Sequence, residues 1–212
     1  MRACLLLVFA ALPLCWGGIE NRWTAPLEAG QTLEIKNVNG SIRAEPADGE
    51  DVEIIALQKG GAQVSIVQHE GGLLVRNGDN VQVDFLIRVP KHIRFIARTI
   101  NGAVDAKQLD SQTEAHTVNG DIHLSTTGSA IAETTNGSID AAVGKIQDGA
   151  RFRTVNGRIS LHLPCGPATV RAHTVHGDIA SEIPRHKHSG HAPELHVTTV
   201  NGAIELNQDN EL

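Results

Sequence analysis

The sequence predicts an all-β protein, built as a β-solenoid of short coils. The first observation is a repeated unit, Thr-Val-Asn-Gly-x-Ile, between about residues 99 and 206. The second is composition: 41% of residues are hydrophobic, only 3% are aromatic, and 21 are glycine. Small and β-branched side chains suit thin layers of β-structure. Self-similarity with a period near 20 residues is typical of stacked repeats.

An Asn-Gly pair marks each unit. The Asn positions are Asn39, Asn101, Asn119, Asn136, Asn156 and Asn201, with His176 substituting once. From Asn101 onward the successive spacings are 18, 17, 20, 20 and 25 residues. Because Asn and Gly tolerate positive φ, we expect them to supply the bend between two short strands.

Four columns around each Asn-Gly pair alternate with polar positions and are therefore expected to face one core. Two residues before the Asn stand Thr99, Thr117, Thr134, Thr154, Thr174 and Thr199, with Asn37 in the first unit. Two residues after the Gly stand Ile42, Val104, Ile122, Ile139, Ile159, Ile179 and Ile204. The outer two columns are mainly Ala, Leu and Phe. The threonines could form a flat recognition surface, but their parity favours buried packing.

Two architectures share this pattern. Each Asn-Gly could be the tip of a hairpin in an antiparallel β-meander or sandwich, or it could be the corner of a solenoid coil. Seven units of two strands would make an open sheet of about 14 strands, which is more than twisted sheets usually sustain. The solenoid is therefore favoured, with the antiparallel meander as the alternative.

The N-terminal segment predicts export. An apolar run from Cys4 to Trp16 follows Arg2 and ends at Gly17-Gly18, as in a signal peptide spanning residues 1–18. The alternative is an anchor that stays attached. No later segment predicts a transmembrane span, so we expect a periplasmic or surface-exposed protein. Removing residues 1–18 changes the formal net charge from −6 to −7 and leaves Cys165 as the single cysteine, which excludes an intrachain disulfide.

The rest of the chain divides into residues 19–98, predicted as irregular N-terminal β coils, and residues 99–212, predicted as the Asn-Gly repeat solenoid. Strand-like runs between Val52 and Val89 would suit irregular coils or a small β-sandwich. Val89-Pro90 should then interrupt the hydrogen-bond ladder. A His-rich loop at 184–196 would explain the 25-residue spacing as an insertion into one coil.

The repeated Val-Asn-Gly-x-Ile unit, the export signal, VQVDFLIRVPKHI at Val81–Ile93 and TINGAV at Thr99–Val104 resemble the bacterial putative-adhesin family. The resemblance covers about Glu20 to Leu206. It implies a right-handed β-helix-like fold in the cell envelope, and it implies no catalytic residues.

Histidines are the first candidates for chemistry. The loop carries His186, His188, His191 and His196, and imidazoles at such spacing could bind Zn, Cu or Ni. No thiolate lies among them and Glu194 is the only acid, so we interpret the loop as solvated and predict neither a metal site nor a cofactor. The remaining candidates are His116, His123, His162, His173 and His176. We interpret these as surface residues, although acid could charge a face shared by His116 and His173.

The run Arg88–Arg98 is the only basic cluster, and it could contact an anionic lipid or polysaccharide. Alternation of Arg94, Ile96 and Arg98 with apolar residues instead favours a strand with one solvated charged face. Nucleic acid is excluded as a partner because the net charge is negative and aromatics for base stacking are scarce.

The sequence contains no catalytic motif for a serine hydrolase, zinc protease or P-loop enzyme. The acids Asp105, Asp121, Asp140 and Asp178 are scattered through turns, and we interpret Cys165 as structural. The sequence therefore predicts an exported, non-catalytic envelope scaffold or adhesin-like binding module, with an envelope protein or glycan as partner. Its alternative is a degenerate carbohydrate-active β-helix enzyme. No particular binding residue is predicted.

Overall fold

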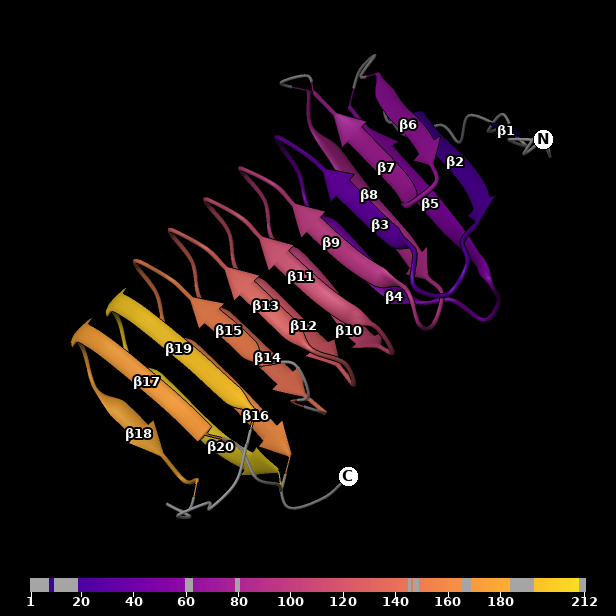
Figure 1. Cartoon of the computed structure of the whole chain (residues 1–212). Helices are drawn as coiled ribbons and strands as arrows, with labels where there is room; N and C mark the ends of the chain where they lie inside the picture. The colour runs from indigo at the N-terminus through magenta and orange to yellow at the C-terminus, as the bar shows by residue number, and fades with distance from the viewer. Residues whose placement is uncertain are drawn as a thin grey trace.

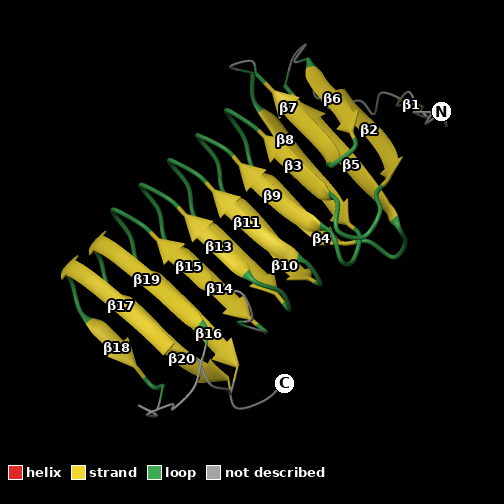
Figure 2. Cartoon of the chain, viewed as in Figure 1, coloured by secondary structure: helices red, strands yellow, loops and turns green. Residues whose placement is uncertain are grey.

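The computed structural model describes residues 8–9, 19–59, 63–78, 81–144, 146, 149–164, 169–183 and 193–209. Nearly all of the predicted signal peptide, Cys165 and three loop histidines (His186, His188 and His191) lie outside the described residues. The described residues form strands and no helix (Figure 2).

The first ten strands are β1 (Val8–Phe9), β2 (Ile19–Pro26), β3 (Thr32–Lys36), β4 (Ile42–Pro46), β5 (Asp51–Gln58), β6 (Val64–His69), β7 (Gly72–Asn77), β8 (Val83–Val89), β9 (Arg94–Arg98) and β10 (Val104–Leu109). The others are β11 (Gln112–His116), β12 (Ile122–Thr126), β13 (Ala130–Glu133), β14 (Ile139–Val143), β15 (Ala150–Arg153), β16 (Ile159–Pro164), β17 (Thr169–His176), β18 (Ile179–Ser181), β19 (Glu194–Asn201) and β20 (Ile204–Asp209).

The strands form two layers that wind into a solenoid, as the sequence predicts. The described strands make an 11-stranded sheet ordered β1-β2-β5-β8-β4-β10-β12-β14-β16-β20-β18 and a 9-stranded sheet ordered β17-β19-β15-β13-β11-β9-β3-β7-β6. From β9 onward each coil contributes one strand to each sheet and pairs in parallel with its neighbours. Figure 1 shows these coils following one another in a right-handed sense.

Each Asn-Gly pair is a coil corner and not a hairpin tip. The corner asparagines stack in register as isolated parallel bridges. The Nδ2 atom of each donates to the Oδ1 atom of the asparagine in the preceding stacked coil, at 2.8–2.9 Å, from Asn101 through Asn201. Side-chain amides carry both a donor and an acceptor, so one residue type can continue such a ladder without interruption.

The expected reason for Asn-Gly holds for only part of the corners: Gly40, Gly137, Gly177 and Gly202 have positive φ, between 118° and 159°. Among the described residues, only His92 and Gln108 combine a side chain with positive φ, so no corner asparagine has it. Gly102, Gly120 and Gly157 also lack positive φ. Glycine is required by close approach instead: a Cβ atom on Gly120 would lie 2.1 Å from the carbonyl oxygen of Gly102. The coils therefore stack too closely at this corner for any side chain.

The threonine column is buried, as its parity predicts, and it also closes the corner by hydrogen bonds. Thr154 and Thr199 are fully buried, and Thr99, Thr117 and Thr134 are 5–6% exposed. Their hydroxyls donate to glycine carbonyls of the adjacent coil, for example Thr154 to Gly137 at 2.9 Å. Threonine thus satisfies a buried carbonyl while packing as a β-branched residue.

One continuous core runs between the two sheets. It includes Phe95 and Phe152 from the nine-stranded sheet and Ile122, Ile139 and Ile159 from the other, all at most 1% exposed. Burial of each isoleucine contributes roughly 1.5–3 kcal/mol, so a stack of coils is stable where a single coil would not be.

The N-terminal strands depart from simple coiling. β2 pairs antiparallel with β5, β5 with β8, and β6 with β7 across the turn at Gly71. Coil β3–β4 then lies between β7–β8 and β9–β10, parallel to both. Val89 ends β8 directly before Pro90, where the sequence predicts an interruption. Both sheets continue through the 98/99 boundary, and the division of the chain there stays a prediction.

The C-terminal coils are stacked out of sequence order. β19–β20 lies against β15–β16, whereas β17–β18 lies outside it and ends both sheets. The long spacing therefore joins the outermost coil to an inner one and is not a simple insertion. For this unit the prediction of a buried isoleucine is wrong. Ile179 is 45% exposed because β18 has no outer neighbour among the described strands.

Candidate functional site

The outward side of the nine-stranded sheet, here called the outer face, carries most of the organised charge. Parallel in-register pairing places every second residue of β3, β9, β11, β13, β15, β19 and β17 in rows across it. The strands run side by side in Figure 1.

Between β3 and β13 the charges on the outer face are paired. Glu114 is only 6% exposed and accepts from Arg94, while Arg98 donates to Glu34 at 3.2 Å and lies 4.0 Å from Glu114. His116 lies beside this group, 3.3 Å from Glu133 and 3.8 Å from Glu114. A buried carboxylate needs such compensation, so this network holds the coils together and leaves little charge for a ligand.

Between β15 and β17 some charged side chains on the outer face have no partner. Arg151 and Arg153 on β15 are both exposed, and neither side chain has an ion-pair or hydrogen-bond partner within the described part of the chain. In register, Arg151 lies between Ile131 and His196, and Arg153 lies between Glu133 and Thr198. Two adjacent guanidinium groups without partners are suited to bind carboxylate or phosphate groups.

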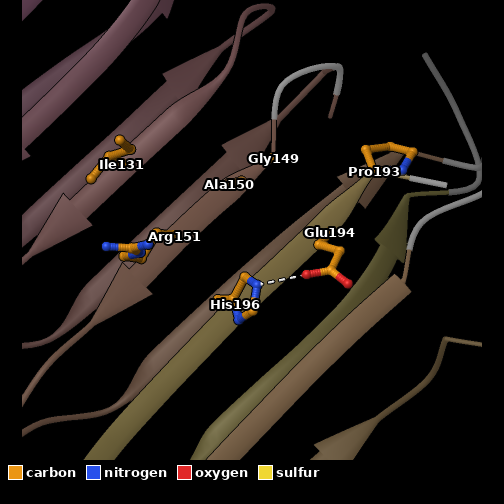
Figure 3. A pocket seen from close by; sticks show the side chains of 7 residues that line it. All are labelled: Ile131, Gly149, Ala150, Arg151, Pro193, Glu194 and His196. Atoms are coloured by element: carbon orange, nitrogen blue, oxygen red, sulfur yellow. Dashed lines mark hydrogen bonds and ion pairs between the residues drawn. The ribbon is translucent and has the colours of Figure 1, made fainter. Parts of the chain in front are cut away.

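A shallow hollow of about 460 Å³ adjoins Arg151, and we call it the β15 hollow. Its lining residues are Ile131, Gly149, Ala150, Arg151, Pro193, Glu194 and His196 (Figure 3). His196 and Arg171 each lie 3.1 Å from the Glu194 carboxylate, and these hydrogen bonds lower the pKa of Glu194 below its ordinary value. The rim therefore presents an ionised acceptor beside a cationic donor.

The predicted histidine sites are not brought together. His116 faces Glu133 on the outer face, whereas His123 lies 4.0 Å from Asp140 on the opposite sheet. His173 also faces outward on β17, four strands from His116 in the sheet order. Among the described residues, no group of three His, Cys, Asp or Glu side chains is arranged to hold a metal.

The basic run Arg88–Arg98 is divided between the two sheets. Arg88 on β8 pairs with Glu53 at 3.3 Å, while Arg94 and Arg98 belong to the paired part of the outer face. The interpretation as a strand with one charged side is confirmed for β9, where Phe95 and Ala97 face the core. The three arginines of this run are therefore all paired with carboxylates.

Sequence reasoning missed Arg151 and Arg153. Both stand in the polar positions that flank Phe152, and that alternation was the available signal. Nothing in the repeat distinguishes them from Arg94 and Arg98, because whether an arginine finds a partner depends on the neighbouring coil. Glu114 was missed for the same reason.

The structure places the protein in the class of parallel β-solenoids, with flat charged faces and shallow hollows. The Toastrack DUF4097 family model matches residues 26–207, and the chain belongs to this family. No curated protein matches the chain significantly. No apolar helix long enough to cross a membrane occurs within the described ranges.

The chain also matches solved structures. A putative cell adhesion protein from Clostridium sporogenes shares 10% identity over 90% of this chain and 100% of its own, with a TM-score of 0.57. A putative adhesin from Bacteroides fragilis shares 11% identity over 90% of this chain and 97% of its own, with a TM-score of 0.35. The first likeness supports the fold alone.

Proposed function

We propose that the protein is an exported, non-catalytic module that binds an anionic partner in the cell envelope through Arg151 and Arg153. The observation that carries the proposal is the contrast along the outer face, where charges pair from β3 to β13 and these two arginines do not. Isolated surface arginines are common, but two on one strand can hold adjacent anionic groups together. Residues 1–18 act as the export signal in this proposal.

The outer face suits adhesion better than catalysis. The β15 hollow is open, and its single carboxylate, Glu194, is exposed and engaged by Arg171 and His196. A hydrolase usually needs several polar groups converging in a concave site that excludes water. A flat sheet instead offers many shallow contacts to an extended partner.

The rival, a carbohydrate-active enzyme, is favoured by one other feature. A hollow of about 670 Å³ near the turns preceding β3, β5 and β9 is lined by the exposed acids Glu28, Asp48, Glu50 and Asp51. Glycosidases place two carboxyl groups on either side of the scissile bond, with one shielded so that it can act as an acid. Release of reducing sugar from a polysaccharide, abolished by Asp48→Asn, would favour this rival.

The test is sedimentation of the protein with isolated cell envelopes at low and high salt. We expect the wild type to co-sediment and the double variant Arg151→Gln/Arg153→Gln to bind about tenfold more weakly, with the wild-type interaction weakened by salt. The protein's intact mass, taken after export, reports whether residues 1–18 were removed.

The matched control is Arg43→Gln/Arg158→Gln. It removes the same charge from the opposite sheet, where these arginines lie near Asp105 and Glu205. Equal loss in both double variants would mean unspecific charge attraction and would contradict the assigned site. No co-sedimentation of the wild type would contradict the proposed function itself.

A further inference from the structure

A second hollow lies at the opposite end of the solenoid, where β2 and β6 are close to the ends of their sheets (Figure 1). We call it the β2 hollow; its volume is about 550 Å³. Its lining residues are Asn21, Trp23, Gln58, Gln63, Val64, Ser65, Arg76 and Gly78. They come from β2, β5, β6 and β7 and from the residues adjoining β6 and β7, so both sheets contribute.

Trp23 gives the hollow an aromatic wall. It is only partly buried and packs against the end of the core, as does Val64. Phe85, Phe95 and Phe152 are at most 2% exposed, which leaves Trp23 as the one aromatic side chain of the described core region that a ligand can reach. A tryptophan offers a large flat apolar surface with one N–H donor at its edge.

Gln58 points to a ligand independently of Trp23. This residue is only 3% exposed, yet its side chain makes no hydrogen bond within the described part of the protein. The Gln58 amide atoms are not among the buried polar atoms without a partner, so they keep contact with solvent although the residue as a whole is buried. Because Gln58 lines the hollow, its amide can donate to and accept from a molecule bound there.

The other polar groups of the β2 hollow indicate which class of ligand it could bind. Asn21 has no side-chain partner, and Arg76 has no ion pair among the described residues. The lining contains no carboxylate or imidazole, which argues against a metal ion. Carboxamides both donate and accept, which matches hydroxyl groups, and Arg76 matches an acidic substituent.

We propose that the β2 hollow binds a sugar unit of an acidic glycan, with the ring against Trp23, hydroxyls on Asn21 and Gln58, and the acidic group near Arg76. The site is separate from Arg151 and Arg153, and the proposal does not rest on binding at the outer face. A lipid is disfavoured because the lining of the hollow is rich in carboxamide groups. A nucleic acid is disfavoured because the lining contains too few cationic side chains.

The experiment applies the protein, expressed from its whole coding sequence, to a printed array of neutral and acidic bacterial and host glycans. The strongest glycan is then titrated by calorimetry. We expect acidic glycans to bind, Gln58→Leu to weaken binding about tenfold, and Arg76→Gln to remove the preference for acidic over neutral forms. Trp23→Phe should weaken binding while keeping an aromatic side chain packed against the core.

Arg158→Gln serves as the control, because it removes an exposed arginine that lies outside both the β2 hollow and the outer face. Thermal melts accompany each variant, so that loss of binding is scored only where folding persists. Absence of any bound glycan would overturn the proposal. The proposal is also overturned if binding survives in both Gln58→Leu and Trp23→Phe, or if Arg158→Gln weakens binding as much as they do.

Discussion

At the scale of single residues, the corner glycines are the most demanding positions. Each corner carbonyl lies where the Cβ atom of the next coil would be, at 2.0–2.1 Å for Gly102, Gly120 and Gly157. The carbonyl oxygen belongs to the backbone, and the position of a Cβ atom is fixed by the backbone that carries it. No rotamer change can therefore relieve the contact. Threonine and asparagine then satisfy and align the same corner by hydrogen bonds.

Gly120→Ala tests this requirement. We expect the free energy of unfolding to fall by roughly 1–3 kcal/mol or more, because the added methyl group forces adjacent coils apart. Urea unfolding followed by circular dichroism measures the change. Gly49→Ala is the control, since a Cβ atom there meets nothing within 4 Å. Equal midpoints for the two variants would show that corner stacking tolerates a side chain.

At the scale of strands, the outermost strand β17 depends on few side-chain contacts. Its residues are exposed or half-buried, whereas its neighbour β19 contributes the fully buried Leu195 and Val197. The Arg171–Glu194 ion pair at 3.1 Å joins the two strands across the surface. Edge strands of this kind are the first places where a sheet opens.

Glu194→Gln should show the pH dependence of that attachment. Because folding lowers the pKa of Glu194, the unfolded carboxylate takes up its proton at higher pH than the folded one. The stabilisation is therefore fully present above the ordinary pKa of 4.5 and is lost as the pH falls through the lower folded pKa. We expect wild type to melt at a higher temperature than Glu194→Gln at neutral pH, and the two melting temperatures to converge once the pH lies below the folded pKa.

Melting temperatures across that pH range measure the difference. Glu182→Gln is the control, because Glu182 follows β18 and has no ion pair in the described chain. A constant gap between wild type and Glu194→Gln down to the lowest pH would contradict the assignment.

At the scale of the molecule, stability is distributed along a line. Each coil contacts its two neighbours in the stack, and the inner columns join into one core. Such arrays behave as coupled units, so a defect in a middle coil separates two halves that lose packing against each other. Ile139 and Ile159, at 1% and 0% exposure, occupy such middle positions.

Ile159→Asp or Ile139→Asp should collapse the array. Each places a charge in the core without a partner, and we expect a loss of at least about 4 kcal/mol. Thermal melts of both variants beside His188→Ala, which we expect to match wild type, provide the measurement. Aspartate variants that melt like the wild type would mean that the isoleucine column is not structural.

The sequence by itself determined the class of fold and the inward columns, because alternation about Asn-Gly is a local property that each unit repeats. It did not determine the order of the coils at either end, since β17–β18 and β19–β20 carry the same local pattern and only long-range pairing decides which lies outside. The exposure of Ile179 follows from that order.

Much of the candidate binding surface was also decided by the tertiary structure, because it too depends on which coils pair with one another. Arg98 and Arg153 occupy equivalent places in the repeat, yet only Arg98 forms ion pairs, with carboxylates 64 and 16 residues away in the chain. Arg153 is in register with Glu133, which pairs with His116 instead. Gln58 and Trp23 meet in one hollow because β2 and β5 pair antiparallel. A residue's parity can be predicted from its own strand, but its partners depend on which coils are stacked beside it.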